Sequence, residues 1–431
     1  MVLADKRVVD IDGDETVEQS DLFFIQGGND AYNIAYTTIY NDLRQEMVSM
    51  EQGVSEAGKI LATDGSGDVI PRNIGDTNTM NQLIDRTISS ISNDSVGFVA
   101  AQAFRSCASL QTVALDACTS IGDSAFMDCT SLTDLSFPAC EYIGISAFAE
   151  LNALSSVCFP ACISIDSYAF SNCASLTNVV FPACKTIGNY AFYHCSSIIS
   201  VSFPLCETIG GAAFAGCSSL PTVNFPACTT ISGAAFVGCV DLTSVYFQVC
   251  TTISTRAFAL CHNLTTVSIP ACITIGEMAF DECRGLVSVD FPACEVISSH
   301  AFSGCWSLTT LNFPACKTIG VGVFSAIGDI TSVNFPACID IGANAFGNCE
   351  EMSLARFSVC TDIGRNAFNG CENLIALYLG ASSVCALAGS NAFFNTPFAR
   401  NRGRIYVPAS LVDSYKVAEN WSYYSNRITA M

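Results

Sequence analysis

Phenylalanine recurs every 22 residues through most of the chain, and this period constrains the fold more than any other feature of the sequence. Thirteen such residues follow one another without an insertion or deletion: Phe104, Phe126, Phe148, Phe170, Phe192, Phe214, Phe236, Phe258, Phe280, Phe302, Phe324, Phe346 and Phe368. Because all the stretches have equal length, each can place the same side chains at the same height as its neighbours. A fixed period between about 20 and 50 residues is typical of a solenoid of stacked repeats.

Each repeat reads roughly CxSLTxVxFPACxxIGxxAFxx, and its first half predicts a short strand. In residues 173–194, Leu176, Val179 and Phe181 form a pattern whose last part alternates with a period of two. Val179 and Phe181 should therefore face inward. Pro182 should end the strand, since proline has no N–H for a sheet ladder. Stacked in register, these strands would form a parallel sheet along one side.

The second half of the repeat predicts a short helical segment. Across twelve repeats the Gly188 position holds Gly eight times, Ser three times and Asp once, and these residues are favoured at helix N-caps. We expect a helical turn or two from about Gly188 to Cys195; a left-handed glycine turn is the alternative. The predicted fold class is a repeat solenoid, α/β, of about 13 coils of 22 residues. A parallel sheet would lie on one side and short helical turns on the other, with a small α+β N-terminal domain.

The 25 cysteines fall mainly in two columns of the repeat. Twelve recur at 22-residue steps from Cys118 to Cys360, and eleven lie three residues after the repeat phenylalanine. Leu151 and Ile327 replace cysteine in the second column, which indicates a buried apolar position that a free thiol can fill. A uniform ladder of parallel side chains suits disulfide geometry poorly. We predict thiols packed in the core, with disulfides and a metal or catalytic role as alternatives.

The charge and the distribution of apolar residues narrow the classes of partner. The formal net charge is −21, and an acidic surface disfavours nucleic acid and anionic membranes. No run approaches the ~20 apolar residues of a membrane-spanning helix, so we expect no membrane insertion. The start, MVLADKRVVDIDGDE, lacks the apolar centre of a secretory signal. The absent signal leaves a cytoplasmic location open. On the resemblances described below, we nevertheless expect an extracellular or virion-associated protein.

The sequence outside the repeats predicts two end domains. We divide the chain into an N-terminal attachment or capping domain (1–98), the solenoid (99–380) and a C-terminal cap (381–431). The predicted N-terminal elements are two hairpins, at 21–26 with 31–36 and at 59–63 with 68–72, and two helices, at 38–55 and 80–91. In the cap we predict a strand at 405–407 and a helix from Ser410, as its N-cap, to about Asn420.

The repeat resembles the leucine-rich repeats of BspA-like proteins, also called the Treponema pallidum type. The segment IGxxAFxxC carries this resemblance over about residues 100–380, first at Ile121–Cys129. The resemblance implies a leucine-rich repeat fold and a surface or secreted adhesin that binds a partner and catalyses no reaction. The stretch from Ile405 to Trp421 is similar to segments that follow such repeats in gut-bacterial proteins. Residues 21–36 loosely resemble modules near the N-termini of phage tail-fibre proteins, and a cap on the first coil is the alternative.

The outward positions of the predicted strands give a candidate binding surface. The position just before the inward phenylalanine varies between repeats, whereas the frame around it does not. Its polar and aromatic side chains suit contact with a protein or a glycan. The candidate site residues are Asn224, Tyr246, Asp290, Asn312, Asn334, Arg356 and Tyr378. Two residues earlier lies a column of Ser and Thr, whose stacked hydroxyls in a second interpretation only solvate the sheet.

Nothing in the sequence predicts catalysis. His194, His262 and His300 occupy different repeat positions, and Walker, Rossmann and zinc-site spacings are absent. We expect no catalytic, cofactor-binding or metal-binding residues, and a non-enzymatic protein that binds a cell-surface protein or glycan. As a phage tail-associated receptor-binding protein it would form a homotrimer. The alternatives are a BspA-like bacterial surface or secreted adhesin and an intracellular protein-interaction scaffold.

Overall fold

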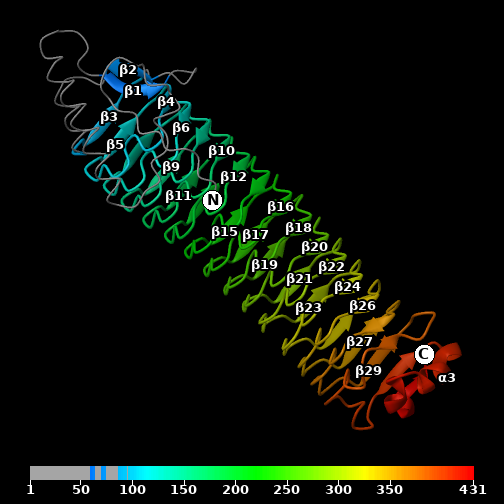
Figure 1. Cartoon of the computed structure of the whole chain (residues 1–431). Coiled ribbons are helices and arrows are strands. Elements are labelled where there is room, and N and C mark those ends of the chain that lie inside the picture. Colours follow the sequence, from blue (N-terminus) through cyan, green and yellow to red (C-terminus); the bar gives the residue numbers. More distant parts are fainter. Residues whose placement is uncertain (1–58, 64–68, 74–85, 95) are drawn as a thin grey trace, which may run out of the picture. The chain divides into compact units, whose positions relative to one another are not determined.

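A computed structural model describes residues 59–63, 69–73, 86–94 and 96–431. From residue 86 onward the described chain winds into parallel coils stacked along one axis (Figure 1). Strands β1 (Lys59–Thr63) and β2 (Val69–Asn73) form an antiparallel hairpin, which confirms the predicted one with its second strand one residue later. The elements predicted between residues 21 and 55 lie outside the described residues. The helix predicted over 80–91 is wrong where it is described, because Ser90–Ser92 is a strand.

The predicted strands are present, and we call them the front strands. Their middle residues face the core and the flanking ones face outward, as Val179 and its neighbours illustrate. The front strands are β3 (Ser90–Ser92), β5 (Thr112–Ala114), β7 (Asp134–Ser136), β9 (Ser156–Cys158), β11 (Asn178–Val180), β13 (Ser200–Ser202), β15 (Thr222–Asn224), β17 (Ser244–Tyr246), β19 (Thr266–Ser268), β21 (Ser288–Asp290), β23 (Thr310–Asn312), β25 (Ser332–Asn334), β27 (Leu354–Phe357), β29 (Ala376–Leu379) and β31 (Arg404–Val407).

Each coil also holds a second, two-residue strand, which we call a back strand and which sequence analysis missed. In each, the second residue, usually Ile, is buried and the first faces outward. These strands form one continuous parallel sheet of 14 strands. They are β4 (Phe98–Val99), β6 (Ser120–Ile121), β8 (Tyr142–Ile143), β10 (Ser164–Ile165), β12 (Thr186–Ile187), β14 (Thr208–Ile209), β16 (Thr230–Ile231), β18 (Thr252–Ile253), β20 (Thr274–Ile275), β22 (Val296–Ile297), β24 (Thr318–Ile319), β26 (Asp340–Ile341), β28 (Asp362–Ile363) and β30 (Ala386–Leu387).

The front strands, unlike the back strands, divide into five shorter sheets, with gaps after β7, β13, β19 and β23. The central residue of each strand that precedes a gap is half-buried rather than buried: Leu135, Val201, Val267 and Leu311. Behind the front strands, stacked phenylalanine rings lie 5.3 to 6.1 Å apart, against 5.1 to 5.5 Å in the repeat-phenylalanine column. The coils are therefore spaced more widely on the front side, which is the side with the interrupted ladder.

The predicted helical turns are wrong, because the second half of each coil contains tight turns and no helix through the described solenoid. In one coil, Tyr190 and His194 adopt the left-handed conformation, with φ of 58° and 56°. The N–H groups of Tyr190, Phe192 and His194 donate to carbonyl oxygens of the next coil at 2.7 to 2.9 Å. Alternate residues therefore bond between coils, as in a sheet, and not along the chain, as in a helix.

Close coil-to-coil packing explains the repeated glycine better than either predicted role. A Cβ on Gly188 would lie 2.5 Å from the carbonyl carbon of Asp166 in the preceding coil, and one on Gly210 would lie as close to the Asn189 nitrogen. The φ of Gly188 is outside the left-handed region, so it is not a left-handed turn residue. No helix follows for it to cap. The absence of a Cβ at these glycines lets the neighbouring backbones approach.

The core consists of the stacked phenylalanines and thiols. All 25 cysteines are free, and all except Cys158 are buried, which confirms the predicted core packing. The thiols also have a polar role, because Cys195 donates to the Phe170 carbonyl oxygen at 3.0 Å and Cys184 to that of Thr186 at 3.3 Å. The first bond recurs through most of the column that contains Cys195, and the second recurs along the column that contains Cys184. Cysteine thus combines apolar volume with a weak donor for backbone oxygens.

A compact segment closes the C-terminal end. It contains η1 (Ala409–Leu411), α3 (Val412–Val417), η2 (Trp421–Arg427) and β32 (Ile428–Ala430). The predicted helix is present but shorter, and Leu411, not Ser410, precedes it. Phe393 stacks on Phe368 at 5.4 Å, so the phenylalanine column extends one coil beyond the uninterrupted period. Trp421 donates its Nε1–H to the Cys385 carbonyl oxygen at 2.6 Å and Asn420 donates to that of Leu387 at 2.8 Å, which satisfies the edge of the last back strand.

Candidate recognition surface

The front strands place the predicted site residues in one outward-facing row, as expected. Six of the seven are exposed, Tyr246 by 44% of its surface, and Tyr378 is half-buried. Each occupies the same strand position, with the residue before it directed into the core. The buried frame therefore sets the position of each residue in the row.

Within this row the structure forms three groups. Asn224 and Tyr246 are register partners on β15 and β17. Asp290 and Asn312 are partners on β21 and β23, and the Asn312 amide donates to Asp290 Oδ1 at 2.7 Å. The third group, Asn334, Arg356 and Tyr378, lies on β25, β27 and β29. The gaps after β19 and β23 separate the groups, so the site is a discontinuous row.

The third group continues into a residue that sequence analysis missed. The Arg356 guanidinium carbon lies 4.2 Å from the centroid of the Tyr378 ring. On its other side, Tyr378 stacks on Tyr406 at 4.5 Å, with 10° between the ring planes. Tyr406 lies 28 residues after Tyr378 and so falls outside the 22-residue count, although its strand, at 405–407, was predicted.

One of the two columns of Ser and Thr beside the row forms hydrogen bonds between coils. Three residues before the site position, side-chain hydroxyls donate to the backbone oxygen 22 residues earlier at 2.9 to 3.2 Å. The donors are Thr133, Thr177, Thr243, Thr265, Thr309 and Ser353. The Ser and Thr column named in sequence analysis, such as Thr222 and Ser288, lies between this ladder and the site row and faces outward. The ladder adds hydrogen bonds between neighbouring coils and does not involve the site row.

The described residues contain no group of three or more His, Cys, Asp or Glu side chains arranged to hold a metal ion. The thiols next to His194 and His262 do not engage them. Cys195 and Cys261 donate to backbone oxygens at 3.0 and 3.2 Å, and burial raises the pKa of both well above its ordinary value. A neutral, hydrogen-bonded thiol is a poor nucleophile.

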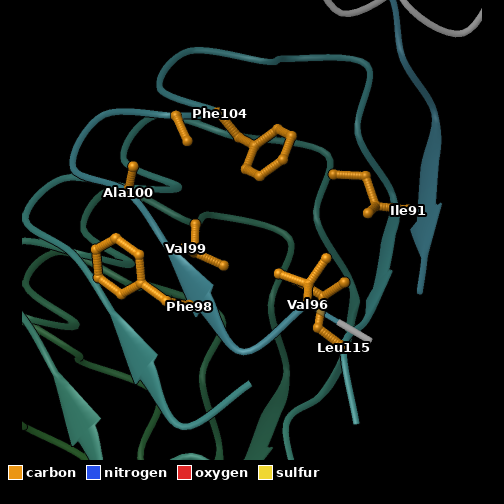
Figure 2. A pocket seen from close by; sticks show the side chains of 8 residues that line it. Ile91, Val96, Phe98, Val99, Ala100, Phe104 and Leu115 are labelled. Atoms are coloured by element: carbon orange, nitrogen blue, oxygen red, sulfur yellow. The ribbon is translucent and has the colours of Figure 1, made fainter. Parts of the chain in front are cut away.

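A small hollow lies among the first coils (Figure 2). Its volume is about 10 Å³, close to that of a single water site, and the side chains that line it are all apolar. Ile91, Val96, Phe98 and Leu115 are among the residues around it. Without polar side chains to orient a ligand, and with room for no more than one water, it is a packing defect and not a binding site. The described part of the chain contains no helix of the length and apolarity that spanning a bilayer demands.

Coils of equal length, an in-register sheet and an inward Leu, Ile and Phe frame define a leucine-rich repeat solenoid. The chain belongs to the family described as BspA type leucine rich repeat region (6 copies), whose model matches residues 87–199, 141–265, 185–309, 251–375 and 295–400. This confirms the resemblance. No curated protein matches the chain.

Several solved structures are similar to the chain. A leucine-rich repeat protein from Bacteroides ovatus is 24% identical, over 70% of this chain and 87% of that chain, with a TM-score of 0.48. A leucine rich cell surface protein from Faecalibacterium prausnitzii is 18% identical, over 78% and 82%, with a TM-score of 0.32. The leucine-rich repeat protein of T. pallidum is 23% identical, over 53% and 87%, with a TM-score of 0.31.

Proposed function

We propose that this protein is a non-enzymatic recognition protein that binds a cell-surface protein or glycan through the outward row of its front strands. One observation carries the proposal: side chains of mixed chemistry stand at equivalent, exposed positions on a repeated frame. Repeat proteins commonly use such extended surfaces for binding. The buried, protonated thiols and scattered histidines offer no comparable basis for catalysis.

Within this proposal we favour a bacterial surface or secreted adhesin over a phage tail-associated protein. Membership of the BspA-type family supports the adhesin. The segments that suggested a tail module lie in residues 1–58, outside the described residues. We keep the three-part organisation, 1–98, 99–380 and 381–431, as part of the proposal. An intracellular scaffold would use the same surface with a different partner.

Cell binding by a row variant tests the proposal. Tyr246, Asp290, Arg356 and Tyr378 are changed together to Ala, and binding of labelled protein to intact bacterial and host cells is measured. We expect the variant to lose binding while its melting temperature stays close to that of the parent, because these side chains point away from the core. The matched control changes three exposed back-strand residues to Ala: Thr186, Thr208 and Thr230. Undiminished binding by the row variant would refute the proposal.

Solution mass separates the two forms of the proposal. The adhesin form predicts a monomer near the chain mass of 45.6 kDa, and the tail-associated form predicts a trimer. Light scattering coupled to size exclusion measures this directly.

A further inference from the structure

The C-terminal end of the solenoid reverses the charge of the rest of the chain. From residue 356 onward there are seven basic and four acidic residues, a net charge of +3 in a chain whose total is −21. Arg356 and Arg404 are both exposed on front strands of this end. A local positive region on an acidic protein concentrates anionic ligands there.

Four side chains share one patch on adjacent front strands, which we call the arginine–tyrosine patch: Arg356, Tyr378, Tyr406 and Arg404. In the register of β27, β29 and β31, Arg356 is opposite Tyr378, and Tyr378 is opposite Tyr406. Arg404 lies two residues before Tyr406 and so faces the same side of the sheet. Strands β27 and β29 mark this place near the C-terminal end (Figure 1).

The charges of the patch are available for a ligand. The ion pairs within the described residues involve Arg284, Lys317, Arg400 and Lys416, and neither patch arginine takes part in them. One Nη1–H of Arg404 donates to the Gly403 carbonyl oxygen at 3.0 Å. The Arg356 guanidinium lies over the Tyr378 ring, a cation–π contact that restrains its position on the sheet surface.

The tyrosine stack determines what the patch can recognise. Tyr378 uses both ring faces, one against Arg356 and one against Tyr406. The Tyr378 ring therefore cannot act as a stacking platform for a base or a neutral sugar. They offer ring edges and phenol hydroxyls, beside two guanidinium groups that bind carboxylate or sulfate oxygens through paired N–H bonds.

We propose that the arginine–tyrosine patch binds the acidic sugar units of a glycan, through a carboxylate or sulfate held by Arg356 and Arg404 and ring hydroxyls held by Tyr378 and Tyr406. The inference rests on the proposed function and names the class of its ligand. Side chains in the row repeat at one strand separation, about 4.7–4.9 Å. An extended peptide advances only about 3.3 Å per residue, so its side chains would fall out of step with the row. A pyranose unit is close to one strand separation in length.

Titration calorimetry of the full chain with four polymers tests the inference. Heparin carries sulfate and carboxylate, hyaluronan only carboxylate, dextran is neutral, and poly-L-glutamate is an acidic peptide. We expect heparin or hyaluronan to bind, dextran not to bind, and poly-L-glutamate to bind at least tenfold more weakly (about 1.4 kcal/mol). Binding should weaken as salt is raised, because the contacts are exposed. Heparin alone would identify sulfate as the bound group, and equal binding of both would identify carboxylate.

A variant without both patch arginines is the decisive comparison with the parent chain. The variant with Arg356→Gln and Arg404→Gln should bind the acidic polysaccharide about tenfold or more weakly, since it loses charge-assisted hydrogen bonds. Arg256→Gln, which removes an exposed arginine from a turn of another coil, should change affinity less than about twofold if the effect is local. Equal binding by the paired variant and the parent would overturn the inference, as would poly-L-glutamate binding as tightly as the polysaccharides.

The outcome is separable from that of the proposed function. If no acidic polysaccharide binds, yet the four-alanine row variant loses cell binding, the front row stands as a recognition surface and the ligand class is wrong. If the row variant keeps cell binding, the proposed function itself is wrong.

Discussion

At the scale of single residues, the cysteines do more than fill space. A buried thiol in each column donates to a backbone oxygen, and burial raises the pKa of the Cys184, Cys228 and Cys239 thiols to about 12. Sequence reasoning could predict burial, because Leu151 and Ile327 substitute for cysteine. The hydrogen bonds could not be predicted, since one goes to a carbonyl of the preceding coil and the other to a carbonyl two residues further along the chain, and the sequence pattern gives the direction of neither.

The thiols should make the fold sensitive to alkali. Their pKa in the folded chain is raised above the ordinary value of about 9, so unfolding releases protons above that pH. The stability they contribute is fully present below about pH 9 and is lost as pH rises toward 12. We expect the melting temperature, followed by circular dichroism, to be flat between pH 7 and 8.5 and to fall steeply above pH 9.5. A flat profile to pH 11 would contradict the shared dry interior.

At the scale of elements, sequence could predict the front strands but not the back strands or the turns. The front strand has three to four residues with visible alternation, as in Asn178–Val180. A two-residue strand such as Thr186–Ile187 shows no period, and its only signal is a β-branched pair that occurs in half of the back strands. The role of the Gly188 position could not be predicted either. A helix N-cap and a close approach of two backbones both favour glycine there, so the residues at this position do not separate the two.

The candidate site, too, could be predicted only in part. Seven row positions could be predicted, because each follows from the front-strand alternation. Tyr406 could not, since an insertion after Tyr378 moves it out of period while its strand still pairs in register.

The C-terminal cap gives a prediction at this scale. Trp421→Phe keeps the buried ring but leaves the Cys385 carbonyl oxygen without its indole donor. An unsatisfied buried acceptor costs about 1–3 kcal/mol. We expect hydrogen exchange to accelerate in β30 and in the coil before it, with coils near β14 unchanged. Equal protection in the parent and the variant would show that the indole bond does not seal the end. Tyr423→Phe, at a residue 75% exposed, is the matched control.

At the scale of the whole solenoid, stability is a sum of contacts between neighbouring coils. Removal of residues 217–238 deletes one full period and joins Gly216 to Cys239, which leaves Phe214 and Phe258 22 residues apart. We expect this chain to fold and to unfold cooperatively by circular dichroism, with a slightly lower melting temperature. Removal of residues 217–227 deletes half a period and should abolish cooperative unfolding, because every later inward side chain is displaced. Similar stability of the two chains would contradict the repeat architecture.

Counting reactive thiols tests the central claim most directly, namely that equal coils enclose one dry interior of phenylalanines and cysteines. Only Cys158 among the 25 cysteines is exposed. With an aromatic disulfide reagent at pH 8, we predict one thiol that reacts promptly in the native protein and 25 after denaturation in guanidinium, and Cys158→Ala should remove the prompt reaction. Several promptly reacting thiols in the native protein, or prompt reaction that persists in Cys158→Ala, would contradict the account.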